Sequence, residues 1–260
     1  MKTIIATALS SVVLAASFAA NAGTLSVGAT PVPHAEILEF VAPVVKEQGV
    51  DLKVVEFNDY VQPNLATDDG ELNANYFQHR PYLESFSQDH GVELVEVASV
   101  HIEPMAVYSN TVKDLKDLKE GASIAIPNDP TNGGRALLLL AKAGLITLSD
   151  PTSITATVMD IKDNPKNIEV KEIEAAQLPR SLDDVDCAVI NTNYAIQANL
   201  NPLKDAILIE DSDSPYVNIL VANKNSAQSE DMKILIKALQ SPETKKFIEE
   251  KYKGAILPAF

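Results

Sequence analysis

The sequence predicts an α/β protein made of two lobes with a ligand site between them, and two observations carry this prediction. Short apolar runs of strand length alternate with stretches of helical periodicity, the signature of a parallel sheet with helices on both faces. The same alternation starts again midway along the chain, at residues 123–126, after a charged connector at residues 113–119. A pattern that restarts in this way favours two α/β lobes facing each other across a ligand.

The first half of the chain contains three strand–helix repeats followed by a broken extended run. Gly49 and Gly91 end two of the helices, because glycine readily adopts the left-handed conformation found after a helix C-terminus. Pro43 should kink the first helix, since proline cannot donate a backbone hydrogen bond. Pro104 divides the extended run at residues 94–108. The expected strands are residues 25–30, 52–57 and 75–80, and the expected helices are residues 35–48, 61–67 and 81–90.

The second half repeats this pattern with shorter elements. No repeat, low-complexity segment or Gly/Ser-rich linker marks a boundary, so the chain should cross between the lobes on strands. The expected strands are residues 123–126, 168–173, 187–190, 206–210 and 217–222. The expected helices are residues 133–143, 177–182, 194–200, 229–239 and 243–252.

The first 22 residues have the composition of a cleavable signal peptide. Lys2 supplies a positive start, a largely apolar stretch follows, and Ala20-Asn21-Ala22 matches the small-x-small pattern before a cleavage site. No other stretch reaches the roughly 18 to 20 apolar residues that a membrane span needs. We therefore expect an exported, soluble protein whose mature chain begins at Gly23.

Charge and cysteine content exclude several classes of function. The formal net charge is −15, and few basic residues cluster, which is unfavourable for binding nucleic acid or anionic lipid. The single cysteine, Cys187, lies in an apolar run and is expected to be a buried, inert thiol. No nucleophile elbow or zinc-protease motif occurs, and the four histidines have no metal-ligand spacing. A Cys187–His79 dyad is the one enzymatic alternative left open.

The segment Asn75-Tyr76-Phe77-Gln78-His79-Arg80-Pro81-Tyr82 is the most informative stretch, because the whole chain has only 5% aromatic residues and four histidines. Strand alternation would place Phe77 and His79 on one side and Tyr76 and Gln78 on the other. Pro81 stops strand pairing and favours the start of a helix. Aromatic rings beside an imidazole at this junction suit a small apolar pocket with a polar edge. A core strand with a polar end is the alternative.

A second candidate lies between the strand at residues 123–126 and the helix that follows. Asn132 or Thr131 can cap this helix, and the free N–H groups of its first turn can bind an anion. Arg135, in the same turn, adds a planar guanidinium that fits a carboxylate with two hydrogen bonds. The segment is not a phosphate-binding P-loop, because the Gly-Lys-Ser/Thr ending is missing. A surface arginine satisfied by solvent is the alternative.

Amide side chains gather at two strand ends, where open α/β sheets bind ligands. Asn191 and Asn193 follow the apolar strand at residues 187–190, and Asn218 lies where another strand begins. An amide oxygen accepts hydrogen bonds from an ammonium without bringing a full charge into a closed cleft. Helix capping is the alternative for Asn193, and hydrogen bonding to the backbone is the alternative for Asn191 and Asn218.

Taken together and in order, these motifs resemble the NlpA-type methionine-binding proteins of bacterial ABC importers, over essentially the whole mature chain. The resemblance implies a two-lobed periplasmic-binding-protein fold that closes over its ligand and delivers it to a permease in the inner membrane. We then expect a signal peptide at residues 1–22, one lobe at residues 23–105 plus 218–260, and a second at residues 106–217. The motifs are Val27–His34, Phe57–Tyr60, Ala74–Leu83, Pro127–Asn132 with Arg135, Gln177–Asp184, Ile190–Tyr194 and Ser214–Asn218.

The resemblance also implies a role for each site residue. Arg135 would bind the ligand carboxylate, and Asn191 and Asn218 would hold the polar end of the amino acid. The side-chain pocket around the thioether would be lined by Tyr60, Phe77, His79 and Tyr82. Aromatic rings make favourable contacts with sulfur, which agrees with a methionine ligand.

One feature departs from the family, and several alternatives stay open. The family is usually anchored by a lipid on a cysteine after the signal peptide, whereas Gly23 follows Ala22 here. We therefore expect an unanchored, freely diffusing periplasmic form that acts as a monomer, without enzymatic activity, cofactor, metal or nucleic-acid partner. The alternative ligands are another amino acid, a methionine derivative or a short peptide, and the alternative class is a hydrolase or transferase on the same fold.

Overall fold

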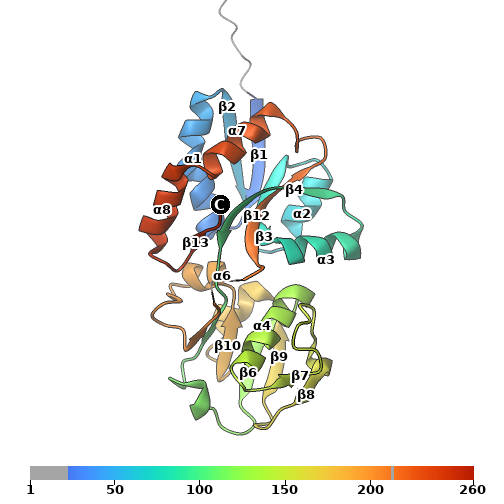
Figure 1. Ribbon diagram of the computed structural model, residues 1–260, viewed down its shortest axis with the longest axis vertical. Coiled ribbons are helices and arrows are strands. Elements are labelled where there is room, and N and C mark those ends of the chain that lie inside the picture. The colour runs from blue at the N-terminus through green and yellow to red at the C-terminus, as the bar shows by residue number, and fades with distance from the viewer. Residues whose placement is uncertain (1–22, 212–213) are drawn as a thin grey trace, which may run out of the picture.

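Two β-sheets, one in each half of an elongated molecule, organise the chain (Figure 1). The computed structural model describes residues 23–211 and 214–260, so the expected signal peptide lies outside the described residues. None of the helices in these two ranges combines the length and the hydropathy that a bilayer span requires. Each sheet is covered by its own helices, and the two-lobed α/β fold expected from the sequence is confirmed.

The first sheet has six strands in the order β13-β4-β12-β3-β1-β2. Only β1 pairs in parallel, with β2 and β3, whereas β12 runs antiparallel to both β3 and β4. The expectation of a parallel sheet is therefore wrong for half of this lobe, because a strand from the end of the chain inserts between β3 and β4. The strands are β1 (Gly23–Ala29), β2 (Val50–Glu56), β3 (Ala74–His79), β4 (Leu94–Ile102), β12 (Val217–Asn223) and β13 (Leu257–Pro258).

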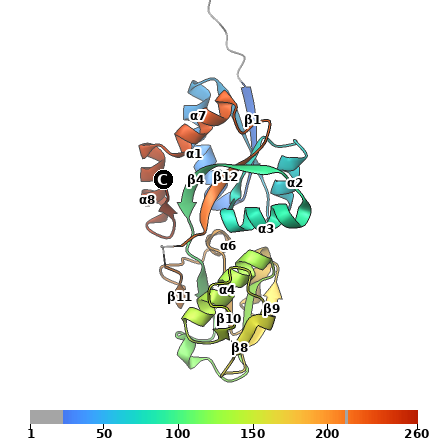
Figure 2. The ribbon, with the colours of Figure 1, turned by 45° about the vertical axis from the view of Figure 1, so that its right-hand side comes forward.

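Helices cover both faces of this sheet (Figures 1 and 2). The main core lies under α1, α7 and α8, where Ile37, Leu235 and Ile248 are fully buried against the strands. The opposite face carries α2 and α3, and a smaller aromatic cluster packs there. The helices are α1 (Glu36–Glu47), which continues through Pro43, α2 (Gln62–Asp68), α3 (Arg80–His90), α7 (Glu230–Leu239) and α8 (Pro242–Tyr252). The turn η1 (Pro31–Ala35), in which Val32 is extended, precedes α1.

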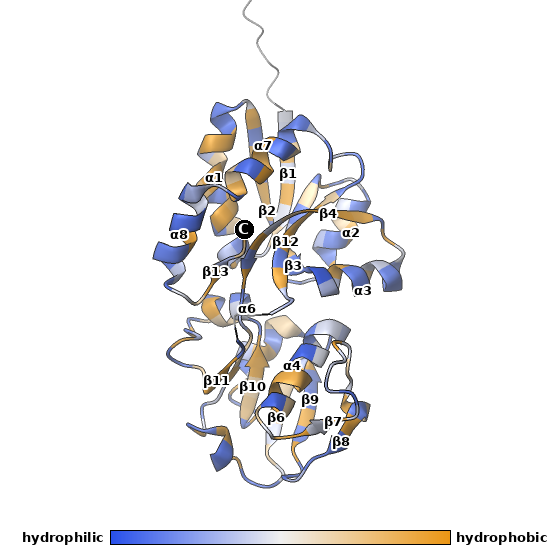
Figure 3. Ribbon diagram, in the orientation of Figure 1, coloured by the Kyte–Doolittle hydropathy of each residue, from blue (hydrophilic) through white to orange (hydrophobic). Residues whose placement is uncertain are grey.

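The second sheet has five strands in the order β11-β5-β10-β6-β9. The strands β10, β6 and β9 are parallel, β5 is antiparallel to β10, and β11 is antiparallel to β5 at one edge. Figure 3 shows β10 as apolar and α3 as largely hydrophilic, which is expected for a buried strand and a helix with a solvent face. The strands are β5 (Ala106–Tyr108), β6 (Ser123–Pro127), β9 (Glu169–Ile173), β10 (Cys187–Ile190) and β11 (Leu208–Ile209), and β7 (Thr147–Leu148) and β8 (Ile161–Asp163) form a separate pair.

Helix α4 packs on one face of the second sheet, and α5 and α6 pack on the other. The helices of this lobe are α4 (Pro130–Lys142), α5 (Leu178–Ser181) and α6 (Thr192–Gln197), with 3₁₀ turns η2 (Leu115–Asp117), η3 (Val158–Asp160) and η4 (Ala175–Gln177). The chain passes between the sheets twice, from β4 to β5 and from β11 to β12. These two crossings carry Glu103 and Glu210 to the boundary between the lobes.

Gly134 fixes how closely α4 approaches the neighbouring loop. A Cβ atom at this position would lie 2.4 Å from the carbonyl oxygen of Ile154 and 2.9 Å from the amide nitrogen of Ala156. Both are backbone atoms, which cannot move aside as a flexible side chain can. Gly134→Ala is expected to lower the free energy of unfolding by about 1 to 3 kcal/mol, the usual cost of overpacking. Urea denaturation measures this loss, and an unchanged stability would show that the loop yields freely.

Candidate functional site

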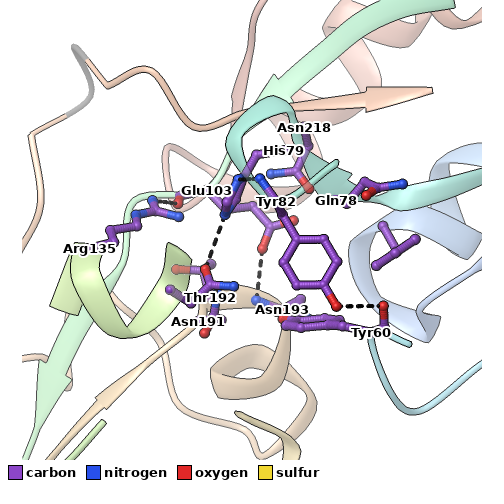
Figure 4. Close-up of a pocket in the computed structure, with 12 residues that line it drawn as sticks. Tyr60, Gln78, His79, Tyr82, Glu103, Arg135, Asn191, Thr192, Asn193 and Asn218 are labelled. Atoms are coloured by element: carbon purple, nitrogen blue, oxygen red, sulfur yellow. Dashed lines mark hydrogen bonds between the residues drawn. The ribbon is translucent and has the colours of Figure 1, made fainter. Parts of the chain in front are cut away.

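A nearly closed cavity lies between the two lobes (Figure 4). Its empty volume is about 340 Å³, but the centre of a water molecule finds only about 20 Å³ of it. The walls therefore leave little continuous room between them. The lining residues come from both lobes and from the first crossing of the chain: Tyr60, Phe77, Gln78, His79, Tyr82, Glu103, Asn132, Arg135, Asn191, Thr192, Asn193 and Asn218. All seven residues singled out from the sequence are among them.

A β-bulge in β3 shapes one wall and corrects the expected alternation. Leu220 of β12 pairs with Tyr76 and Ile219 pairs with Gln78, so Phe77 is the extra residue. The bulge brings Gln78 to the side of Asn75, whose Oδ1 accepts a hydrogen bond from Gln78 Nε2 at 2.8 Å. Tyr76 lies on the other side. The prediction that Tyr76 and Gln78 share a side is wrong, because an extra residue breaks the period of two.

Three aromatic rings form the apolar part of the cavity. The ring centroids of Tyr60, Phe77 and Tyr82 lie 5.8 to 6.0 Å apart in each pair. The Tyr82 hydroxyl donates to the carbonyl oxygen of Tyr60 at 2.8 Å, which fixes the loop before α2. The Tyr60 hydroxyl donates to Asn193 Oδ1 at 2.7 Å and thereby connects the two lobes. These rings provide a surface suited to an apolar or sulfur-containing side chain.

His79 caps α3 and reaches across to the other lobe. Its Nδ1 accepts a hydrogen bond from the Tyr82 backbone N–H at 3.2 Å, so Nε2 carries the proton. Nε2 then donates to Asn132 Oδ1 at 3.1 Å. Burial, followed by the positive charge of Arg135, lowers the pKa of His79 to about 3. The ring is therefore neutral at physiological pH and contributes one fixed N–H to the contact between the lobes.

The N-terminus of α4 differs from the expectation. The helix begins at Pro130, and its cap is Asp129, whose Oδ1 accepts from the Asn132 backbone N–H at 2.9 Å. The predicted caps, Asn132 and Thr131, both lie inside the helix. Thr131 and the Asn132 amide also donate to Asp129. A carboxylate already occupies this helix terminus, so it is not an open anion site.

Among the residues that the structure describes, Arg135 is the only cationic side chain that lines the cavity. It is 3% exposed, so the alternative of a surface arginine satisfied by solvent is excluded. Its Nε donates to Glu210 Oε1 at 3.0 Å, and its Nη2 donates to Glu210 and, at 2.8 Å, to the backbone oxygen of Glu103. The guanidinium also lies 4.2 Å from the centre of the Tyr216 ring. Among the described residues, Nη1 has no hydrogen-bond partner, which leaves one N–H edge for a ligand.

The three asparagines bind other side chains instead of caps or backbone. Asn191 Nδ2 donates to Asn132 Oδ1 at 2.9 Å, and Asn218 Oδ1 lies 2.9 Å from His34 Nε2. Asn193 does not cap α6, since the cap position is Asn191 and no side-chain cap bond forms there. Within the described part of the chain, the buried atoms Asn191 Oδ1 and Asn193 Nδ2 have no partner. Unpaired buried polar atoms are costly, so both are available to a ligand.

Glu103 is a charged site residue that the sequence reasoning missed, and Thr192 is another lining residue that it did not single out. Glu103 is 5% exposed and lines the cavity from the first crossing. Its carboxylate accepts from His101 Nε2 at 2.7 Å and from the Asn193 backbone N–H at 2.9 Å, and it lies 3.3 Å from His34 Nε2. The sequence signal was the spacing His101-x-Glu103 at the end of a strand, which puts both side chains on one face.

The histidines around Glu103 are buried and neutral. Burial lowers the pKa of His34 to about 4 and that of His101 to about 3. His34 Nδ1 lies 2.7 Å from the Thr30 hydroxyl, and His101 Nδ1 lies 2.5 Å from the Tyr76 hydroxyl. The metal-binding atoms of His34, His101 and Glu103 all lie within 4.8 Å of one another. Hydrogen bonds already use these atoms, so the group is explained as a network that holds one carboxylate.

Cys187 lies away from the cavity. It begins β10, whereas Asn191 and the cavity follow the other end of this strand. The thiol is buried, as predicted, and burial raises its pKa to about 11. A thiolate is therefore disfavoured. This removes the basis for a Cys187–His79 dyad.

Two α/β lobes joined by two crossings, closed over a cavity with charged and aromatic walls, define a substrate-binding protein of the periplasmic type. Similar proteins specify the family. A family model described as NlpA lipoprotein matches residues 25–260. The chain belongs to the NlpA lipoprotein family, as the resemblance of its motifs implied.

Individual relatives agree with this assignment. A probable D-methionine-binding lipoprotein MetQ of Pasteurella multocida is 43% identical over 234 residues, which cover 90% of this chain and 85% of that protein. A nutrient binding protein from Burkholderia cenocepacia, solved bound to methionine, is 49% identical and has a TM-score of 0.88, covering 91% of this chain and 100% of that one. An ABC transporter periplasmic substrate-binding protein from Coxiella burnetii is 42% identical with a TM-score of 0.86, covering 90% and 100%.

These relatives contradict the expectation of an unanchored, freely diffusing form. The family is described as a lipoprotein family, and the relatives from Pasteurella multocida and Vibrio cholerae are both named lipoproteins. The expectation depended on a single position, Gly23 after Ala22, whereas the comparison covers almost the whole chain. The sole cysteine of the sequence, Cys187, is buried in β10.

Proposed function

We propose that this chain is an exported lipoprotein that binds methionine between its lobes and delivers it to an ABC importer in the inner membrane. Family membership supports this proposal, as do the methionine-bound neighbour and the neighbour described as part of an ABC transporter. The lobes would be residues 23–105 plus 218–260 and residues 106–217. The protein would act as a monomer, without catalysis and without a nucleic-acid partner.

The composition of the cavity wall carries the proposal. One guanidinium and one carboxylate, from Arg135 and Glu103, match the two charges of an amino-acid zwitterion. In this proposal Arg135 binds the ligand carboxylate through its unpaired edge, and Asn191 and Asn218 hold the polar end. Tyr60, Phe77, His79 and Tyr82 surround the thioether. Aromatic rings make favourable contacts with a thioether sulfur. A neutral His79 adds no charge beside the apolar side chain of the ligand.

The competing proposals are that the same fold binds a different ligand or catalyses a reaction. A different amino acid, a methionine derivative or a short peptide would also bring a carboxylate and an ammonium. A hydrolase or transferase would need a nucleophile and a base, and Cys187 is not placed to act with His79. Incubation of candidate substrates with the purified protein, followed by product analysis, tests the enzymatic alternative.

Methionine is expected to stabilise the folded protein. At a ligand concentration of roughly 100 Kd, one-site linkage adds about 2.7 kcal/mol to the free energy of unfolding. The melting temperature should rise with methionine after any co-purified ligand has been removed by unfolding, dialysis and refolding. Both enantiomers are tested, with leucine and glycyl-methionine as comparison ligands of similar chemistry.

The outcome assigns the ligand. No shift with either methionine enantiomer, together with a clear shift for another amino acid or for the dipeptide, would replace methionine by that ligand. Mass spectrometry of small molecules released from natively produced protein provides an independent identification.

A further inference from the structure

Asn132 contacts residues of both lobes, and the proposed methionine site does not yet use it. It is 2% exposed, lines the cavity and lies in the first turn of α4. Its Oδ1 accepts from Asn191 Nδ2 at 2.9 Å within its own lobe and from His79 Nε2 at 3.1 Å across the boundary. Figure 4 shows His79 and Asn191 on opposite sides of this boundary. One amide oxygen therefore serves two residues of the proposed site.

The direction of the Asn132 amide is fixed by Asp129, the cap of α4. Asn132 Nδ2 lies 3.0 Å from each of the two carboxylate oxygens of Asp129. A carboxylate accepts hydrogen bonds and cannot donate them, so the NH2 group of Asn132 must face Asp129. A reversed amide would place its oxygen against both carboxylate oxygens and leave them without these donors. Asn132 Oδ1 is therefore directed toward His79 and Asn191.

The surrounding groups hold Asp129 as an acceptor. The Asn132 backbone N–H donates to it at 2.9 Å, and the Thr131 hydroxyl donates at 3.1 Å. Burial raises the pKa of this carboxyl, and the hydrogen bonds from Asn132 and Thr131 oppose that rise. A negative charge is also favoured beside the N-terminus of a helix. Asp129 is thus the group from which the direction of the neighbouring hydrogen bonds follows.

Asn132 passes this direction on to two residues of the proposed site. His79 must donate from Nε2, which agrees with its Nδ1 accepting from the Tyr82 backbone N–H at 3.2 Å. Asn191 must donate from Nδ2, since a reversed amide would set two oxygens against each other. The Oδ1 of Asn191 is then left free, and within residues 23–211 and 214–260 this buried atom has no partner. Both neighbours of Asn132 therefore agree with the direction that Asp129 sets.

We propose that Asp129 and Asn132 are positioning residues of the ligand site. Asp129, which is not among the residues that line the cavity, fixes the direction of the Asn132 amide. Asn132 thereby fixes the donor that His79 offers across the boundary and the free acceptor that Asn191 presents to the cavity. This inference rests on the proposed function and extends that site to the carboxylate that orients its side chains.

An exchange of the two side chains tests whether hydrogen-bond direction matters, as opposed to packing alone. Asp129→Asn keeps a residue type that caps helices well, but it sets a second NH2 group against that of Asn132. Calorimetric titration should show methionine binding weakened at least about fivefold. Adding Asn132→Asp restores an acceptor toward His79 and Asn191, to which the new amide at position 129 can donate. The double variant should bind more tightly than Asp129→Asn, to within about threefold of the wild type.

Hydrogen exchange at the Asn191 side chain gives a readout in the unliganded protein. The Nδ2 proton that bonds to Asn132 Oδ1 should exchange slowly in the wild type, as followed by NMR of isotope-labelled protein. Its exchange should become at least about fivefold faster in Asp129→Asn, because the acceptor at position 132 turns away. The double variant should return it toward the wild-type rate. Damage to the end of α4 alone would not produce this recovery.

Asp150→Asn is the matched control, since it makes the same change of charge on the same lobe. Asp150 is exposed and accepts from the Thr152 backbone N–H at 2.9 Å and from the Thr152 hydroxyl at 2.7 Å. It lies outside the cavity wall. The affinity for methionine and the exchange of Asn191 should both equal those of the wild type.

Unchanged Asn191 exchange or unchanged affinity in Asp129→Asn would overturn the inference. A double variant that binds no more tightly than Asp129→Asn would overturn it as well, because the two substitutions would then act without regard to direction. If the double variant does not fold, the exchange and affinity of Asp129→Asn decide. Failure of methionine to bind the wild type would instead contradict the proposed function, and Asn191 exchange in the unliganded proteins would still test the direction set by Asp129.

Discussion

Replacement of Arg135 by alanine is expected to weaken methionine binding by about 2 to 5 kcal/mol, the range for truncating one member of a buried charge pair. A ligand carboxylate enclosed between the lobes loses its water, and the nearest helix terminus is already occupied by Asp129. Arg135 is 3% exposed and, within residues 23–211 and 214–260, is the only cation that lines the cavity. Calorimetric titration of methionine into the variant measures the loss.

Arg80→Ala is the matched control. Arg80 follows the strand that carries His79, but its side chain is 57% exposed and pairs with Glu96. Its removal should cost well under about 1 kcal/mol of binding, since exposed ion pairs contribute little. Arg135→Ala also leaves Glu210 without its partner, so the stability of the unliganded variant is measured in parallel. If Arg80→Ala lost more binding than Arg135→Ala, the ligand carboxylate would not lie at Arg135 as proposed.

Acid is expected to destabilise the protein through three buried histidines. Burial lowers the pKa values of His34, His79 and His101 from 6.5 to about 4, about 3 and about 3. Below pH 6.5 the unfolded chain binds protons at these rings while the folded protein does not. The stabilising contribution is therefore complete above pH 6.5 and is lost as the pH falls, at about 1.4 kcal/mol per pH unit for each ring.

Two carboxyl groups, the buried Glu103 and the partly buried Asp129, act in the opposite direction. Burial raises the pKa values of Glu103 and Asp129, so the folded protein takes up these protons earlier than the unfolded chain. The net loss between pH 6.5 and pH 4 should therefore be about 1 to 4 kcal/mol per pH unit. Urea denaturation at several pH values, without ligand, measures this slope.

Histidine variants isolate the contribution of one ring. His101→Gln should reduce the slope by about 1.4 kcal/mol per pH unit, whatever its effect on stability at neutral pH. His90→Gln, which replaces the exposed histidine at the end of α3, is measured in parallel as a variant outside the buried network. An unaltered slope in His101→Gln would mean that this ring does not remain neutral in the folded protein.

Local sequence signals determined most of the elements and several of their ends. Pro104 separates β4 from β5, and Gly91 ends α3 in the left-handed conformation. The apolar run at residues 187–190 is β10 without any shift of its bounds. These features depend on backbone conformation and side-chain periodicity, which act over a few residues. The motifs around Tyr60, His79 and Arg135 also led to the family, because they occur in a particular order.

Contacts between distant segments decided the rest. The insertion of β12 makes the first sheet mixed and creates the bulge at Phe77, which turns Gln78 to an unexpected side. Glu103 is a site residue whose distant contact, with His34, exists only in the fold, whereas its contact with His101 is local. Periodicity describes one segment at a time and carries no information on which segments meet. Burial, hydrogen bonding and charge compensation depend on contacts between distant segments, so only the tertiary structure could assign them.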